Sequence, residues 1–145
     1  MEFIKCKLVP DAFAPERAYR TDAGWDLKTP YDVVVGPCMT SQGAGKSIID
    51  TGVHIAIPEG YCGLIVAKSG LNVKSHLTAT GLIDSGYSGS IRVKLYNYGS
   101  HEYEFKRGDK VAQIIFIPIC TAALVLVDDI EKGERGDNGF GSSGK

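Results

Sequence analysis

Short runs of alternating apolar and polar residues dominate the chain and predict β-strands. The clearest run covers residues 48–57, where every second position is apolar or threonine: Ile49, Thr51, Val53, Ile55 and Ile57. Residues 90–97 repeat the pattern, with Arg92 and Lys94 on the face opposite Ile91, Val93 and Leu95. Because successive side chains of a strand point to opposite faces, each run would give one face to the core and one to solvent.

Further strands are expected in residues 61–68, 101–119 and 122–130, which are bounded by Gly, Pro, Asn and Asp turn signals. No window has an apolar 3.6-residue repeat over ten or more residues. A helical turn or two is expected near residues 69–74, and another near residues 129–134. With 18 glycines and 6 prolines available for turns, the pattern predicts an all-β fold, a compact barrel or sandwich.

Composition narrows the class of protein without changing this fold. The 145 residues fit one domain, and 16 basic against 17 acidic residues leave a net charge of −1. General binding to nucleic acid or to an anionic membrane needs a basic surplus or a basic face, and this charge balance gives no support for either. The first residues lack the apolar core of a signal peptide, and no apolar stretch approaches the ~20 residues that span a bilayer. We expect no nucleic-acid or membrane partner and a cytoplasmic location, or host cytoplasm or nucleus for a viral or phage protein.

The four cysteines and three histidines are scattered, and no C-x-x-C pair occurs. We therefore expect reduced, mostly buried cysteines and no zinc site built from protein ligands.

The last residues, "ERGDNGFGSSGK" (134–145), differ in composition from the rest. A segment so rich in Gly and Ser cannot bury enough apolar surface to order itself, so a frayed terminus is one interpretation. It contains a G-x-G-x-x-G pattern, but no helix follows, which excludes a dinucleotide-binding turn. Arg135 and Phe140 add a cation and a stacking surface. We divide the chain into a domain, 1–133, and a glycine-rich arm, 134–145.

Five polar or glycine-rich stretches, mostly at strand ends, carry the candidate chemistry. They are "DAGWDL" (22–27), "AKSGLNVK" (67–74), "GLIDSGYSG" (81–89), "GDKVAQII" (108–115) and "RGDNGFGSSG" (135–144). Each alone has a structural explanation: Asp26 could be a turn residue, Ser69 could cap a short helix, and Asp84 could open a hairpin turn. Together, and in this order, they resemble the five motifs of the trimeric dUTPase family.

The resemblance covers about residues 20–144. It implies hydrolysis of dUTP to dUMP and pyrophosphate with Mg²⁺, which keeps uracil out of DNA and supplies dUMP for thymidylate synthesis. It also implies a distorted jelly-roll-like β-barrel (the dUTPase-like β-clip) that assembles as a homotrimer. The active sites would lie between subunits, and a C-terminal arm would close over the nucleotide.

The resemblance also assigns roles to residues of the domain. Asp84 would position and deprotonate the water that attacks the α-phosphorus, and Asp26 would help hold hydrated Mg²⁺ through water. The phosphates would be bound by Lys68, Ser69, Gly70 and Gln113. The backbone from Thr78 through Gly81 to Ile83 would read uracil, and Tyr87 would pack under the deoxyribose and exclude a 2′-hydroxyl.

In the arm, Phe140 would stack on uracil. Arg135, Ser142 and Ser143 would wrap the γ-phosphate together with the backbone of Gly141, because glycine lets a backbone approach phosphate oxygens closely. Closure of the arm would expel water from the site.

Some positions depart from the family pattern. Lys68 and Lys110 stand where arginine is common, and lysine lacks the bidentate fork of a guanidinium. Gly86 replaces a second acid, Trp25 replaces Tyr or Phe, and Ser143 replaces threonine. The loop at residues 36–47 is longer than the fold requires and has no assigned role.

Two alternatives remain open from the sequence. A dCTP deaminase of the same fold would need a glutamate after the hairpin, and residues 90–97 contain no carboxylate. A dUTP-gated regulatory or binding protein would need a partner surface, for which the 36–47 loop is the candidate.

Overall fold

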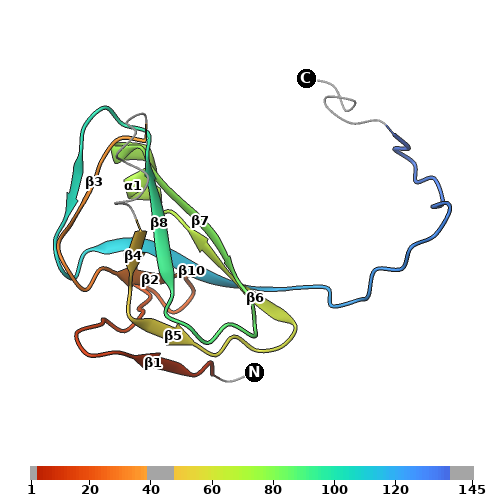
Figure 1. Cartoon of the computed structure of the whole chain (residues 1–145), viewed down its shortest axis with the longest axis horizontal. Coiled ribbons are helices and arrows are strands. Elements are labelled where there is room, and N and C mark those ends of the chain that lie inside the picture. Colours follow the sequence, from red (N-terminus) through yellow and green to blue (C-terminus); the bar gives the residue numbers. More distant parts are fainter. Residues whose placement is uncertain (1–2, 39–47, 138–145) are drawn as a thin grey trace.

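The computed structural model describes residues 3–38 and 48–137, and this part of the chain is almost entirely β-structure with one short helix (Figure 1). In chain order the elements are β1 (Cys6–Leu8), β2 (Trp25–Lys28), β3 (Val33–Val35), β4 (Ile48–Asp50), β5 (Val53–Ile55), β6 (Tyr61–Val66), α1 (Ser69–Ser75), β7 (Leu77–Ile83), β8 (Arg92–Asn97), β9 (Tyr103–Phe105) and β10 (Lys110–Pro118).

Six strands form one curled sheet in the order β2-β10-β6-β7-β8-β4, and β1–β5 and β3–β9 form two further pairs. Every pairing among these strands is antiparallel. The all-β, barrel-like fold expected from the alternation is therefore confirmed. Within residues 3–38 and 48–137, no helix has the length and apolar character needed to cross a bilayer.

The alternation in residues 48–57 predicts burial correctly, because Ile49, Thr51, Val53, Ile55 and Ile57 are all buried. It misses a break in the strand at Gly52, where φ is +68° and a Cβ would come within 2.6 Å of the Val9 side chain. Only glycine adopts this backbone without strain, so the run divides into β4 and β5. The Thr51 hydroxyl donates to the Ile91 carbonyl at 2.8 Å and so joins the β4–β5 connection to the residue just before β8.

One core fills the inside of the curled sheet. Its fully buried large side chains are Leu27, Val35, Ile49, Val53, Ile65, Leu77, Ile91, Val93, Leu95, Phe105, Val111 and Ile114. Asn97 is one of the buried polar residues and lies at the end of β8, with its amide nitrogen donating to the carbonyls of Val35 and His101, each at 2.9 Å. This buried amide joins β8 to β3 and stabilises the closed end of the barrel because its hydrogen bonds are satisfied.

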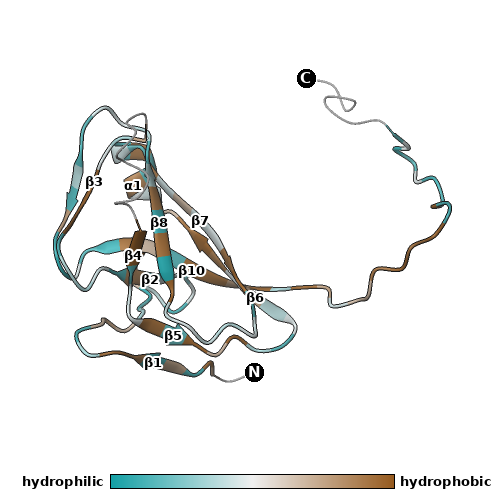
Figure 2. Cartoon of the chain, in the orientation of Figure 1, coloured by the Kyte–Doolittle hydropathy of each residue, from teal (hydrophilic) through white to brown (hydrophobic). Residues whose placement is uncertain are grey.

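The helix expected near residues 69–74 is present as α1, but residues 129–134 contain no helix. The strand expected at residues 122–130 is also absent: after β10 the chain leaves the sheet, and Leu124 and Leu126 are fully exposed. Figure 2 shows this segment as apolar and separated from the body. An apolar strand needs a partner for its backbone and its side chains, and none of the strands described here provides one.

The expectation for the cysteines is half right. All four are free, but Cys62 is the one that is buried, whereas Cys6 and Cys120 are exposed and Cys38 is half-buried. The exposed positions lie in β1 and just after β10, at the margins of the fold.

Candidate active site

Three of the expected site residues, Asp26, Lys68 and Gln113, meet Lys110 where β2, β10 and β6 lie side by side. Gln113 on β10 pairs with Asp26 on β2 and with Val66 on β6. Lys68 follows β6 by two residues and precedes α1, and Lys110 begins β10. The sheet therefore brings together residues from three of the sequence stretches that are far apart in the chain.

Asp26 is the centre of this cluster. It is 5% exposed, and its carboxylate accepts hydrogen bonds from two lysines, Lys68 on one oxygen and Lys110 at 2.7 Å on the other. Burial alone would raise the pKa of Asp26, but the hydrogen bonds from Lys110 and Lys68 outweigh it and hold the pKa below its ordinary value. Asp26 is therefore ionised at neutral pH and fixes the two ammonium groups.

Glu16 extends the cluster and was not anticipated from the sequence. Its carboxylate lies 2.9 Å from the ammonium of Lys28 and 3.2 Å from that of Lys110. The Asp26 amide donates to the Glu16 carbonyl at 2.7 Å. The hydrogen bond that Lys110 donates to Asp26, followed by the one it donates to Glu16, raises the pKa of Lys110.

The cluster carries three lysines and two carboxylates, so its net charge is +1 although the chain as a whole is slightly acidic. Lys28 could have been found from the sequence, because it lies two residues after Asp26 on the same strand and so on the same face. Glu16 lies outside the five stretches, and only the fold brings it here.

The side chain of Gln113 is held between two segments of backbone. Its amide nitrogen donates to the Ala67 carbonyl at 3.2 Å. On its other side lies Gly24, where a Cβ would come within 2.2 Å of the Gln113 amide oxygen. Gly24 lies in the first of the five sequence stretches, where it had no assigned role. Its missing side chain leaves the space that Gln113 occupies.

Ser69 and Gly70 form the first turn of α1, directly after Lys68, and both are exposed. They therefore lie beside the basic cluster, at the rim rather than inside it.

The donor set at the cluster fits a magnesium ion that arrives with a triphosphate. No group of three or more His, Cys, Asp or Glu able to hold a metal is found among residues 3–38 and 48–137. Mg²⁺ keeps several waters and commonly uses one or two carboxylates plus substrate phosphates. The Asp26 carboxylate, already shared between two lysines, suits contact with a metal-bound water better than direct ligation.

The residues expected to read uracil and deoxyribose, and the expected base Asp84, lie on the β7–β8 hairpin. Thr78 and Ala79 on β7 pair with β8, and this ladder ends at Ala79 opposite Leu95. From Thr80 to Ile83 the strand pairs with β6 on its other side. The hairpin therefore opens beside Gly81 and Ile83, where one backbone edge of β7 leaves the β8 ladder.

A tight turn with several anchors closes the hairpin. Asp84 opens it: the Tyr87 amide donates to the Asp84 carbonyl at 3.1 Å. The Tyr87 hydroxyl donates to the Ser90 carbonyl at 2.9 Å. A ring nitrogen of His54 lies 2.9 Å from the Ser88 carbonyl, and the Ser90 hydroxyl donates to Asp50. Asp84 itself is exposed.

A single chain does not bring the hairpin and the basic cluster together. Ile83 pairs with Gly63 near the start of β6, so Asp84 lies level with Cys62, whereas Lys68 is six residues further along. At ~3.3 Å per residue the two parts of the site are about 20 Å apart along the strand. Arg135 is exposed, and the C-terminal segment after β10 extends away from the sheet in Figure 1. Phe140, Gly141, Ser142 and Ser143 lie outside the described residues.

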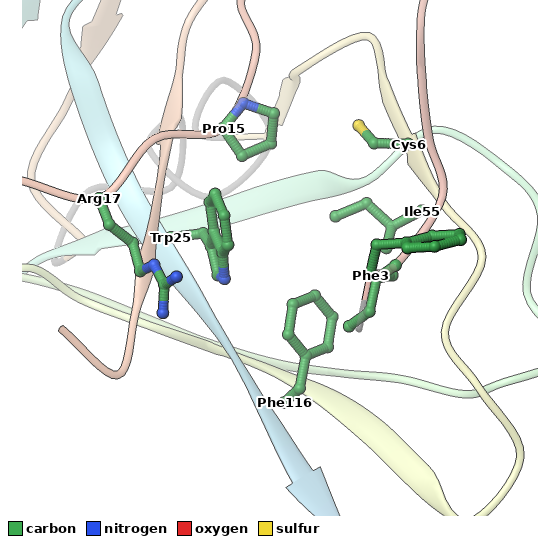
Figure 3. Close-up of a pocket in the computed structure, with 8 residues that line it drawn as sticks. Phe3, Cys6, Pro15, Arg17, Trp25, Ile55 and Phe116 are labelled. Atoms are coloured by element: carbon green, nitrogen blue, oxygen red, sulfur yellow. The ribbon is translucent and has the colours of Figure 1, made fainter. Parts of the chain in front are cut away.

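An apolar cavity of about 510 Å³ lies beside Trp25 of β2 (Figure 3). Because neighbouring side chains of a strand point to opposite faces, Asp26 belongs to the other face. Phe3, Ile55 and Phe116 line the cavity, and Trp25 forms one wall with the guanidinium of Arg17 4.3 Å from the centre of its ring. Its lining lacks the charged cluster described above, so it is a surface for apolar contact rather than for phosphates.

Comparison with known proteins agrees with the fold and the site. The dUTPase family model matches residues 11–144. A deoxyuridine 5′-triphosphate nucleotidohydrolase of Tropheryma whipplei is 36% identical over 142 residues, covering 95% of this chain and 93% of the relative. The chain belongs to the dUTPase family.

Solved structures of phage enzymes are similar over most of the fold. The dUTPase of Staphylococcus bacteriophage 80alpha, solved with dUpNHpp, superposes with a TM-score of 0.89 at 32% identity and covers 100% of both chains. A variant dUTPase of the S. aureus phage phi11, whose structure describes the coordination of a structural Mg(II) ion, has a TM-score of 0.77 at 31% identity. It covers 88% of this chain and 97% of that one. Neither open alternative, a deaminase or a regulatory binding protein, is favoured by these matches.

Proposed function

We propose that this protein hydrolyses dUTP to dUMP and pyrophosphate as a dUTP diphosphatase. The observation that carries the proposal, beside membership of the family, is the cluster of Asp26, Lys68, Lys110 and Gln113 at the β2–β10–β6 junction. The cluster supplies a local positive charge in a chain whose net charge is −1. Binding of a triphosphate requires such a local positive charge.

Phosphate binding would rest on ammonium groups rather than on guanidinium forks. Lys68 and Lys110 are oriented by Asp26, and both keep partly exposed side chains that a ligand can reach. Gln113 offers an amide beside them, and Ser69 and Gly70 add a hydroxyl and a backbone at the rim. Mg²⁺, reaching Asp26 through water, would neutralise charge on the phosphate oxygens.

Asp84 would act as the general base. It is exposed at the start of the hairpin turn, so a water and the α-phosphate can reach it. General base catalysis contributes ~10²–10⁴-fold, so alignment of the water with the α-phosphorus and neutralisation of the phosphates must supply the rest. Attack at the α-phosphorus makes pyrophosphate the leaving group.

Selectivity would arise on the same hairpin. The backbone from Thr78 to Ile83, around Gly81, would pair with the uracil edge where β7 leaves the β8 ladder. A cytosine would set a donor against a donor and leave a buried polar group unpaired, at a cost of about 1–3 kcal/mol. Tyr87 would pack under the deoxyribose.

The complete site would form between copies of the chain in a homotrimer. Two observations support this: the ~20 Å between Asp84 and Lys68 within one chain, and the apolar segment after β10 that one chain leaves exposed. Association that covered Leu124, Val125 and Leu126, or the cavity beside Trp25, would bury apolar surface at ~25 cal/mol per Å². The arm, residues 134–145, would then close over a bound nucleotide, with Arg135 and Ser142 at the γ-phosphate and Phe140 on uracil.

Product analysis tests the proposal. The protein is incubated with dUTP, dCTP, dTTP or UTP, with and without Mg²⁺, and nucleotides, pyrophosphate and ammonia are measured. We expect dUMP and pyrophosphate from dUTP in the presence of Mg²⁺. Release of ammonia from dCTP would favour the deaminase instead.

Asp84→Asn tests the assignment of the base. The variant should bind dUTP with similar affinity and turn it over at least about 10²-fold more slowly. Turnover within a few-fold of wild type would remove Asp84 from the role of base.

A further inference from the structure

The ring of Tyr87 folds back over Gly89 within the hairpin turn. A Cβ on Gly89 would lie 2.4 Å from the Tyr87 hydroxyl oxygen, 2.5 Å from Cζ and 2.9 Å from Cε2. Non-bonded atoms make favourable contact near 3.5–4.0 Å. The ring can therefore occupy this position only because residue 89 has no side chain.

The turn holds the hydroxyl end of the ring. The Tyr87 hydroxyl donates to the Ser90 carbonyl at 2.9 Å, so its polar tip is bound by the backbone just past Gly89. Ser90 is itself fixed by its hydrogen bond to Asp50, and Ser88 by its contact with His54. The position of the aromatic face thus depends on the backbone of residues 88–90, against which the ring lies.

We propose that Gly89 is a positioning residue for sugar selectivity, acting through Tyr87. The inference rests on the proposed function, in which this ring packs under the deoxyribose. A methyl group at residue 89 would move the ring by roughly 1 Å or more to restore ordinary contact distances. The displaced ring no longer defines the space beside C2′, so a ribose with its 2′-hydroxyl is rejected less well.

The expected effect is on discrimination rather than on stability alone. A largely apolar contact surface rejects an added hydroxyl by about 10²-fold. When the ring is displaced, much of this 10²-fold discrimination against the 2′-hydroxyl should be lost. We expect the ratio of kcat/KM for dUTP to kcat/KM for UTP to fall by about ten-fold or more in Gly89→Ala.

The experiment compares four variants with wild type using both nucleotides. Gly86→Ala is the matched control, because it lies in the same turn and a Cβ there would meet nothing within 4 Å. It should keep the wild-type ratio. Tyr87→Ala should lower the ratio, and Gly89→Ala in the Tyr87→Ala background should lower it no further, since the ring that Gly89 seats is already gone.

Each outcome decides the point. A wild-type ratio in Gly89→Ala, or an additional loss in the double variant, overturns the role of Gly89. If Gly89→Ala fails to fold, the double variant keeps the test open: folding with the ratio of Tyr87→Ala supports the inference, and failure to fold shows that Gly89 serves something other than the ring. Should wild type not hydrolyse dUTP at all, the proposed function fails, whereas dUTP hydrolysis with an unchanged ratio overturns only this inference.

Discussion

Replacing Asp26 by asparagine removes the carboxylate that orders the basic cluster while keeping its size. Asp26→Asn leaves Lys68 and Lys110 without the charge that each now contacts. The amide oxygen of asparagine can still accept one hydrogen bond, so the loss is one charge-assisted bond and the weakening of a second.

The size of the effect follows from burial. Hydrogen bonds to charged groups contribute about 1.5–3 kcal/mol each, and breaking a fully buried ion pair costs about 3–5 kcal/mol. The Asp26 side chain is 7% exposed, but those of Lys68 and Lys110 are 29% and 36% exposed. Both ammonium groups can therefore turn toward water, which reduces the expected loss in the free energy of unfolding to about 2 kcal/mol at pH 7.

The loss should depend on pH in one direction. The pKa of Asp26 is held below its ordinary value in the folded protein, and an unfolded aspartate titrates near a pKa of about 3.9. Its contribution to stability is therefore complete well above pH 4 and is lost as pH falls through the lower, folded pKa. The difference between wild type and Asp26→Asn should shrink as the pH drops from 5 toward 3.

Urea unfolding at a fixed protein concentration measures both effects. With a slope of about 2 kcal/mol per M, a loss of about 2 kcal/mol lowers the urea midpoint by about 1 M at pH 7. Glu59→Gln, at an exposed position in the turn before β6, is the control and should leave the midpoint in place. Equal midpoints for wild type and Asp26→Asn at pH 7, or a difference that persists undiminished at pH 3, would refute this account of the cluster.

Three further predictions concern the site and the assembly. Gly24→Ala should displace Gln113 from its bond to Ala67 and lower kcat/KM for dUTP by about 10-fold; a value equal to that of the control Gly133→Ala, where a Cβ would meet nothing within 4 Å, would contradict the contact. If the protein assembles as proposed, Leu126→Asp should shift it toward a smaller species in sedimentation, because it puts a charge into the apolar segment; a sedimentation coefficient equal to that of wild type would show that this residue lies outside the interface. Deleting residues 134–145 should leave the circular dichroism spectrum intact while turnover of dUTP falls sharply, and unchanged kinetics would return the arm to a frayed terminus.

Much of the body of the fold could be read from local pattern. Period-two alternation predicted the buried residues of 48–57 and of β8, because the direction of a side chain on a strand depends on its immediate neighbours in the chain. The short helix and the hairpin turn at Asp84 were also visible, since helix turns and hairpins are formed by residues close in sequence. The break at Gly52 was not visible, because it depends on how near Val9, the residue just after β1, comes to this position.

Which strands become neighbours was decided only by the tertiary structure. The meeting of Asp26 with Lys110, and of Gln113 with Gly24, requires that β2 pair with β10 from the far end of the chain. Glu16 joins the cluster through a separate antiparallel bridge to Asp26, at a position that none of the five motifs includes. The segment after β10 shows the converse: its pattern is that of a strand, but a strand exists only where another backbone meets its hydrogen bonds, and no strand within residues 3–38 and 48–137 pairs with residues 122–130.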